Sequence, residues 1–235
     1  MSNLVPAFRD SVFSPLGDLA GEVLEVGIDM VLENEALKSI PIVNTVLGLC
    51  KVGVNLHERN LLRQTAIFIN EVRDGTISSE KLEQHRAELE RDPEKAEKEL
   101  GRVLIILGRQ VDDYQSKVLG SFYRAFVRGA ISWAKFCELA EANSRMFSGD
   151  YIVLEDAYYG DLKNNKRELY QIDRLTSLGL LENQQRTGVA EDDRSSFQDG
   201  IVTINNTSDK NVSLTSFGIT FCQLMPKSRI VSVLQ

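Results

Sequence analysis

The stretch YQSKVLGSFYRAFVRGAISWAKFCELAEANSRMF, residues 114–147, decides the fold class of this chain. Its apolar residues recur every three or four positions on both sides of a short turn, which is typical of amphipathic helices. Gly129 is a natural helix end, and Ser132 is a natural N-cap for the next helix. The stretch therefore predicts a compact helical hairpin. Four aromatic side chains in it predict an aromatic core: Tyr123, Phe126, Trp133 and Phe136.

Helical patterns continue on the N-terminal side of this hairpin. Residues 1–15 contain two prolines and little periodicity, so we expect a loose arm there. Residues 16–31 then predict an amphipathic helix with an acidic outer face. Asp92 followed by Pro93 is typical of a helix start, because aspartate caps a helix and proline fits its first turn. Further helices are predicted over residues 57–75, 78–92 and 94–111, and the last of them is expected to have a polar first half and a buried second half.

The most apolar run of the chain is SIPIVNTVLGLCKVGVNL, residues 39–56, in which Lys51 is the one charge. Pro41 suits the first turn of a helix, and we expect a single helix over Ile42–Leu56. The wide apolar arc of this helix indicates that it is covered on several sides. Polar and small residues spaced by three or four form one narrow stripe, which is a candidate binding surface: Asn44, Gly48, Lys51, Asn55 and Arg59.

Two interpretations of this apolar helix remain open. The favoured one is a central core helix of a soluble α-helical domain. In the other, the helix leaves the core and turns its polar stripe toward water and its apolar side toward lipid or partner subunits. The second interpretation describes a membrane-acting or oligomerising effector. No stretch reaches the roughly 20 apolar residues that an ordinary membrane-spanning helix needs.

The chain changes character near Leu162, which is the predicted domain boundary. The predicted fold class is mainly α, with a multi-helix bundle over residues 1–161 and a small α+β unit over 162–235. Within the second domain, the segment 167–182 predicts a helix that ends near Gly179, and a polar loop is predicted over 182–200. Two strands are predicted within 201–218, followed by a final helix or strand over 218–225.

Composition limits the classes of function. The formal net charge is −7 and the pI is near 5.0, which argues against a protein that coats nucleic acid through a basic surface. Cys50, Cys137 and Cys222 lie far apart without CxxC spacing, so they predict neither a disulfide framework nor a zinc site. Buried free thiols suit a reducing cytoplasm.

Sequence motifs for catalysis are absent. The chain has no GxSxG, HExxH or phosphate-binding glycine loop. His57 and His85 lie in charged helical stretches, where we expect solvated side chains. The acidic pairs Asp112-Asp113 and Asp192-Asp193 are expected in helix caps or loops. The chain is therefore predicted not to be an enzyme, with no catalytic residue, metal or cofactor.

The C-terminal domain contains LTSLGLLE, residues 175–182, and LTSFGITFCQLM, residues 214–225. These strings resemble the end of a winged-helix domain, in which "L..LGL" closes the recognition-type helix and "LT..G" follows the wing. Residues 162–235 hold nine Lys/Arg and eight Asp/Glu, so DNA binding and protein contact both remain open for this unit. The resemblance implies a nucleic-acid face formed by Lys166, Arg167, Tyr170 and Arg174.

The whole layout has a further resemblance. A helical region, a segment beginning Pro41-Ile42-Val43 and the strings LGLL and LTSFG resemble uncharacterised bacterial helical proteins linked to phage defence, including the abortive-infection alpha-domain type. The prediction is a non-enzymatic bacterial interaction protein, acting as a defence effector or regulator through self-association, a protein partner or a membrane. It is expected in the cytoplasm or at the inner face of the inner membrane, and a DNA-binding regulator is the alternative.

Overall fold

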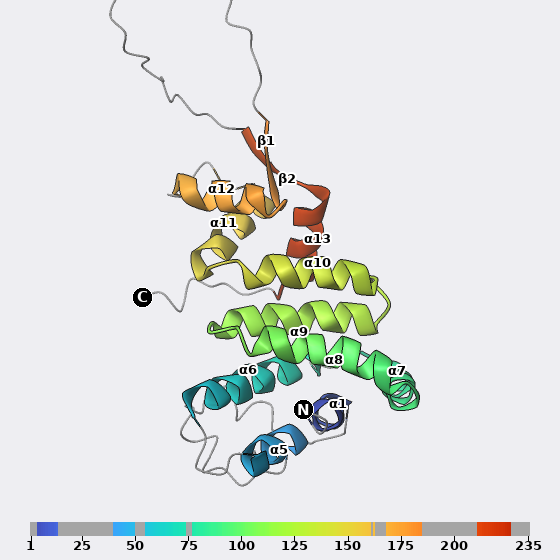
Figure 1. Ribbon diagram of the computed structural model, residues 1–235. Coiled ribbons are helices and arrows are strands. Elements are labelled where there is room, and N and C mark those ends of the chain that lie inside the picture. The colour runs from blue at the N-terminus through green and yellow to red at the C-terminus, as the bar shows by residue number, and fades with distance from the viewer. Residues whose placement is uncertain are drawn as a thin grey trace, which may run out of the picture. The chain divides into compact units, whose positions relative to one another are not determined.

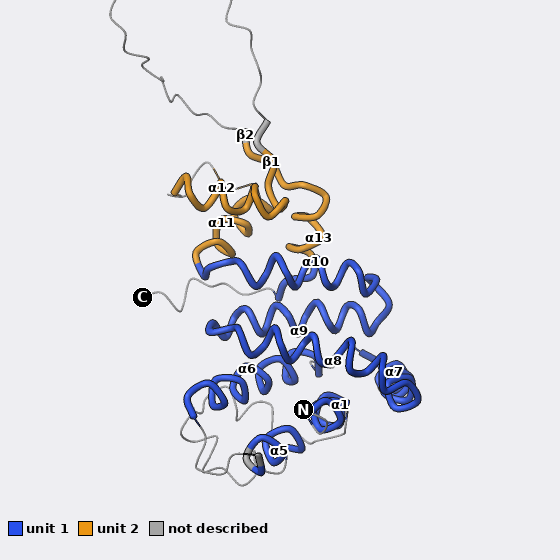
Figure 2. The backbone as a smooth tube through the Cα atoms, in the orientation of Figure 1, with its two compact units in different colours: residues 1–148, 224–235 blue, residues 149–223 orange. Residues whose placement is uncertain are grey.

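The structure is a computed structural model that describes residues 4–13, 40–49, 55–73, 77–160, 162, 168–184 and 211–226. These residues form ten helices and one sheet of two strands, which confirms that the chain is mainly α-helical. The chain divides into two compact units, coloured separately in Figure 2. The first contains Met1–Ser148 and Leu224–Gln235, and the second contains Gly149–Gln223. The boundary predicted near Leu162 lies inside the second unit.

The described part of the first unit is a helical bundle. Its helices are α1 (Leu4–Phe13), α5 (Pro41–Leu49), α6 (Leu56–Val72), α7 (Ser79–Arg91), α8 (Pro93–Leu107), α9 (Asp113–Val127) and α10 (Trp133–Ser144). Helix α9 packs against both α6 and α10, as Figure 1 shows. Its buried side chains therefore form the centre of this unit.

The predicted hairpin is confirmed as α9 and α10. Gly129 has a φ of 75° and ends the first helix, because a left-handed conformation costs glycine little. The side chain of Ser132 accepts a hydrogen bond from the backbone N–H of Lys135 and caps α10. Tyr123 and Phe136 are fully buried, and their ring centroids lie 5.7 Å apart. The predicted aromatic core is therefore confirmed for Tyr123 and Phe136, whereas Phe126 and Trp133 are half-buried at its edge.

The expectation of a loose arm over residues 1–15 is wrong. Residues 4–13 form α1, a helix of the bundle core. Val5, Phe8 and Val12 are spaced by three and four positions, so they share one face, and at most 6% of each is exposed. The proline in this segment does not prevent the helix, because it lies in the first turn, where its missing N–H costs nothing.

The described part of the apolar run is a core helix, which supports the favoured interpretation for α5. Ile42, Val43 and Val46 are buried with 5% or less exposed. The hydroxyl of Ser11 in α1 accepts a hydrogen bond from the backbone N–H of Ile42 at 2.9 Å. The start of α5 is thus held directly against α1.

The prediction of a single helix over Ile42–Leu56 is wrong. Asn55 has extended backbone, with φ −76° and ψ 169°, and it is the N-cap of α6. Its side chain accepts a hydrogen bond from the N–H of Glu58 at 3.0 Å, while the Glu58 carboxylate accepts one from the N–H of Asn55 at 2.9 Å. This capping box starts a new helix, and residues 50–54 lie outside the described part of the chain.

The second unit holds the C-terminal elements. They are α11 (Ser148–Tyr159), α12 (Leu169–Ser177), β1 (Leu181–Gln184), β2 (Asn211–Leu214) and α13 (Ser216–Leu224). Helix α12 ends at Ser177, and Gly179 follows its C-cap with a φ of 72°, so the end predicted near Gly179 is confirmed. The two strands are antiparallel, with Leu181 opposite Leu214. The final element, left open between helix and strand, is a helix.

The predicted polar loop over 182–200 is wrong at its start, because Glu182–Gln184 belong to β1. Leu180 and Leu181 are buried, because the chain passes close to the start of α13 at Leu180 and then pairs with β2 as a strand. Gly218 permits this approach, since a Cβ there would lie 2.1 Å from the carbonyl oxygen of Leu180. The other predicted strand, residues 201–207, lies outside the described residues.

The chain returns to the first unit at Leu224. The hydroxyl of Ser121 donates a hydrogen bond to the carbonyl oxygen of Leu224 at 2.5 Å, and that of Tyr114 donates one to Pro226 at 3.3 Å. Both donors belong to α9. The described end of the chain is therefore fastened to the central helix of the bundle.

Candidate functional site

The predicted polar stripe is not assembled on one helix. Asn44 and Gly48 are exposed on α5, whereas Asn55 and Arg59 belong to the start of α6. Lys51 lies outside the described residues. The extended backbone at Asn55 breaks the helical spacing on which the stripe depends. That these residues bind a partner remains a prediction, but it no longer rests on a continuous stripe along one helix.

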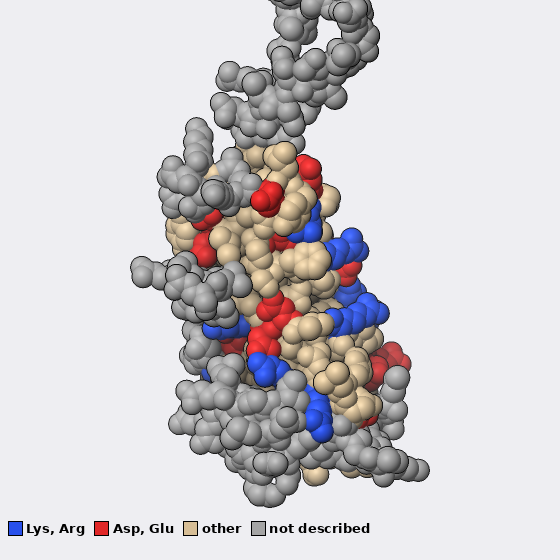
Figure 3. Space-filling view, turned by 90° about the vertical axis from the view of Figure 1, so that its left-hand side faces the viewer, with Lys and Arg blue, Asp and Glu red and all other residues tan. Residues whose placement is uncertain are grey.

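The predicted nucleic-acid face is also divided. Lys166 and Arg167 lie outside the described residues, and Tyr170 is exposed on α12. Arg174 donates two hydrogen bonds to the fully buried carboxylate of Asp150, from Nε at 2.8 Å and from Nη2 at 2.9 Å. Arg174 thus neutralises a buried charge within the second unit. On the face shown in Figure 3, basic and acidic side chains are interspersed.

A groove of about 750 Å³ lies on the first unit, lined by the starts of α1 and α6 and by one face of α8. Val5, Leu61, Leu104 and Ile105 contribute apolar surface to it. Ile105 is 58% exposed, although isoleucine is among the residue types most often buried. An exposed apolar side chain within a concave apolar surface is a candidate contact site.

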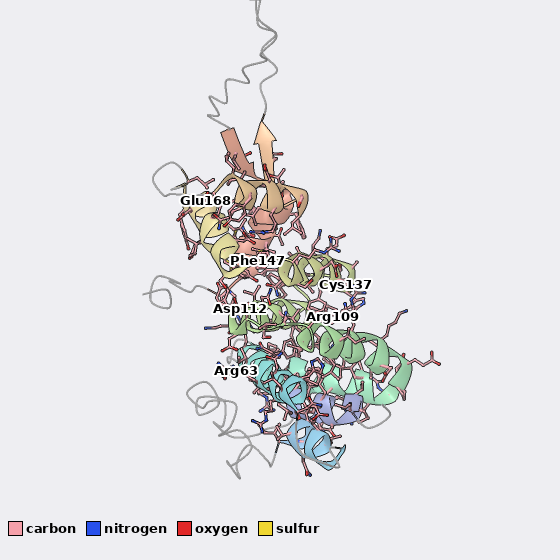
Figure 4. The ribbon with its side chains drawn as sticks, turned by 60° about the vertical axis from the view of Figure 1, so that its left-hand side comes forward. Arg63, Arg109, Asp112, Cys137, Phe147 and Glu168 are labelled. Carbon is pink, nitrogen blue, oxygen red and sulfur yellow. The ribbon has the colours of Figure 1, made fainter. Side chains whose placement is uncertain are left out.

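Cations line the edge of this groove. Lys98, Arg102 and Arg109 are exposed, and in the described part of the chain none of them forms an ion pair. Arg109, labelled in Figure 4, follows Gly108, the C-cap of α8. Glu97 is the one acidic residue of the lining, and His57 completes its polar part. On a chain with a net charge of −7, this groove is locally positive.

The sequence contained a signal for this groove. Positions 98, 102, 105 and 109 are spaced by four, three and four, which places their side chains along one face of the α8 segment. Gly101 leaves room on that face, because a Cβ there would meet nothing closer than 3.6 Å, the Oε1 atom of Glu97. The second half of this helix was expected to be buried, which is wrong for Ile105.

A second feature lies inside the bundle. His85 is only 11% exposed, so the expectation of a solvated side chain is wrong. Its Nε2 lies 2.7 Å from Oε1 of Glu99, and the hydroxyl of Tyr123 donates a hydrogen bond to the same oxygen at 2.7 Å. Burial and the neighbouring Glu99 carboxylate raise the pKa of Tyr123 well above its usual value. We call these residues the His85–Glu99–Tyr123 cluster.

The cluster borders a small cavity of about 220 Å³. Lys81 lines this cavity, but its amine donates a hydrogen bond to the backbone carbonyl of Arg128 at 2.9 Å. The rings of Phe13 and Phe126 lie against His85, with centroids 5.7 Å and 5.5 Å away. The Glu99 carboxylate lies within hydrogen-bond distance of the Tyr123 hydroxyl and of the His85 ring, so the cluster links α7, α8 and α9 and stabilises their packing.

Replacing Tyr123 by phenylalanine is expected to lower the free energy of unfolding by about 1.5–3 kcal/mol, because the buried Glu99 carboxylate loses a donor. Urea unfolding measures this loss. Tyr114→Phe is the matched control, since its hydroxyl donates to a neutral backbone carbonyl at 3.3 Å, and we expect at most about 1 kcal/mol there. Equal effects of the two changes would contradict the role of Glu99.

The described thiols are not activated nucleophiles. Burial raises the pKa of Cys222 to about 12 and also raises that of Cys137. Among the described residues, no three His, Cys, Asp or Glu side chains group to hold a metal ion. None of the helices in the described ranges has the length and hydropathy to cross a membrane.

Comparison with known proteins adds no assignment. No family model, curated protein or solved structure matches the chain.

Proposed function

We propose that this chain is a non-enzymatic interaction protein and that the groove along α8 is its docking site. The observation that carries the proposal is the exposed Ile105 within an apolar groove whose cationic edge has no ion pair in the described chain. Helical bundles often bind a partner by receiving an apolar helix face in such a groove. Arginine is also enriched in protein interfaces, because its guanidinium combines apolar contact with charge pairing.

Site-specific photo-crosslinking in the producing cell tests this function. A benzophenone amino acid at position 105 is expected to give a discrete crosslinked species. The same group at Val111, an 84% exposed residue outside the groove, is expected to give none. A crosslink from position 105 but not from position 111 identifies the groove, because a non-specific surface contact would give crosslinks from both positions.

A substitution that fills the groove without unfolding the protein supplies a second test. Gly101→Leu adds a side chain where a Cβ has ordinary contact distances, so we expect the variant to fold. Its leucine occupies the groove, and the crosslink from position 105 is expected to disappear. Crosslinking that persists in this variant, or that is equal from position 111, would overturn the groove as the docking site.

The second unit supports a finer proposal. The order of α12, β1, β2 and α13 fits a winged-helix-like element, and its mixed charge favours protein contact over DNA. The resemblance to bacterial phage-defence proteins supports a role as a defence effector or regulator. A DNA-binding regulator remains the alternative, with Lys166 and Arg167 as its candidate contacts.

A further inference from the structure

We infer that the occupant of the groove along α8 is an acidic amphipathic helix of a partner protein. The inference rests on the proposed function and names the chemistry of its partner. Its three supports are the apolar lining, the exposed cations at the edge and the absence of a side chain at Gly101 on the same face of α8.

The shape of the groove fits a helix. From Lys98 to Ile105 the α8 axis rises about 10 Å, which is close to two helical turns. Gly101 has no side chain, so a partner helix can approach α8 closely at this point. A partner helix with apolar residues at i, i+3 or i+4 and i+7 presents a ridge that matches Leu61, Leu104 and Ile105.

The charge of the groove selects an acidic partner. Docking removes water from Lys98, Arg102 and Arg109, and this desolvation is unfavourable unless carboxylates replace the water. Glutamates or aspartates on both sides of the partner's apolar ridge supply those carboxylates. A helix with lysines at these positions places like charges together, so it is rejected.

The same features disfavour two other occupants. A symmetric pairing of this face with a second copy sets the cations of one copy against those of the other. A membrane surface favours apolar side chains that project outward, whereas most apolar residues here line a concave surface and Val5 is buried.

Peptide binding to the full chain tests the inference. Three labelled synthetic peptides of about 18 residues, or five helical turns, share one leucine stripe and carry glutamate, glutamine or lysine beside it. Fluorescence anisotropy is expected to show the glutamate peptide binding at least about tenfold tighter than the glutamine peptide, with no binding of the lysine peptide. Raising the salt from about 50 mM to about 300 mM is expected to weaken the glutamate peptide most.

Charge reversal supplies the matched variants. Arg102→Glu combined with Arg109→Glu is expected to abolish binding of the glutamate peptide and to permit binding of the lysine peptide. Lys135→Glu is the control, because it adds an acid on the same unit outside the groove and places a glutamate three residues after the Ser132 N-cap. Gly101→Leu, which leaves the charges unchanged, is expected to lose all peptides.

The outcomes separate the two proposals. Equal binding of the glutamate and glutamine peptides overturns the acidic partner but leaves the docking groove, which the crosslinks from position 105 test independently. The absence of a crosslink from position 105 in the chain that keeps Gly101 overturns the function itself. Binding of anionic phosphatidylserine vesicles that depends on Arg102 and Arg109, without binding of any peptide, overturns the helix in favour of a membrane.

Discussion

Replacing Gly120 by alanine is expected to lower the free energy of unfolding of the protein by about 2–3 kcal/mol, the largest effect of any single methyl group that we expect in α9. A Cβ at this position would lie 2.8 Å from the Cβ of Glu71 and 2.9 Å from the backbone oxygen of Phe68. Both belong to α6, so α6 and α9 would have to separate. Chemical denaturation measures the loss.

Gly101→Ala is the control for this prediction. It makes the same chemical change inside a helix of the same bundle, where the nearest atom to the new Cβ is 3.6 Å away. Alanine there is expected to raise the free energy of unfolding by about 0.5–1 kcal/mol, because glycine is a poor helix former. Stabilisation by both substitutions would show that backbone propensity, and not helix packing, governs the effect at Gly120.

Replacing Arg174 by methionine is expected to destabilise the second unit by about 3 kcal/mol, because the change leaves the buried Asp150 carboxylate without its bidentate partner. Hydrogen exchange of the amides in α11 and α12 measures the loss within this unit. Arg145→Met is the control, since the exposed ion pair of Arg145 with Glu141 on α10 contributes at most about 1 kcal/mol.

The Arg174 prediction also affects the DNA-binding alternative. Loss of DNA binding in an Arg174 variant would follow from unfolding of the second unit, so it would not identify a contact to phosphate. Adding Asp150→Asn to Arg174→Met removes the buried charge that has lost its arginine and is expected to recover part of the stability. No recovery in the double variant would contradict the ion pair as the cause.

The local signals in the sequence predicted the centre of the bundle well. The hairpin of α9 and α10 follows from Gly129, Ser132 and the aromatic spacing, and all of these act within a few residues of the chain. The start of α8 at Asp92 and Pro93 was predicted in the same way. Caps and glycine turns are readable because their hydrogen bonds join near neighbours in sequence.

The errors in prediction arose where tertiary contacts decide the structure. Helix α1 is short, and it is stabilised by burying Phe8 against Phe68, whose ring centroid is 5.8 Å away. Strand β1 pairs with residues about thirty positions later, beyond the reach of local patterns. His85 of α7 is buried by its contacts with other helices, where Glu99 of α8 and Tyr123 of α9 complete the cluster. The groove was missed because helical spacing predicts which residues share a face and does not predict whether that face is covered.

The return of the chain at Leu224 makes the second unit an insertion into the bundle. Residues 149–223 begin after α10, and the chain comes back to hydrogen bonds with Ser121 and Tyr114 of α9. In evolutionary terms, such a unit can lengthen, shorten or be exchanged without altering the order of the helices that form the groove. All lining residues of the groove that we propose as a docking site belong to the first unit, so a change of length within residues 149–223 leaves that lining unaltered.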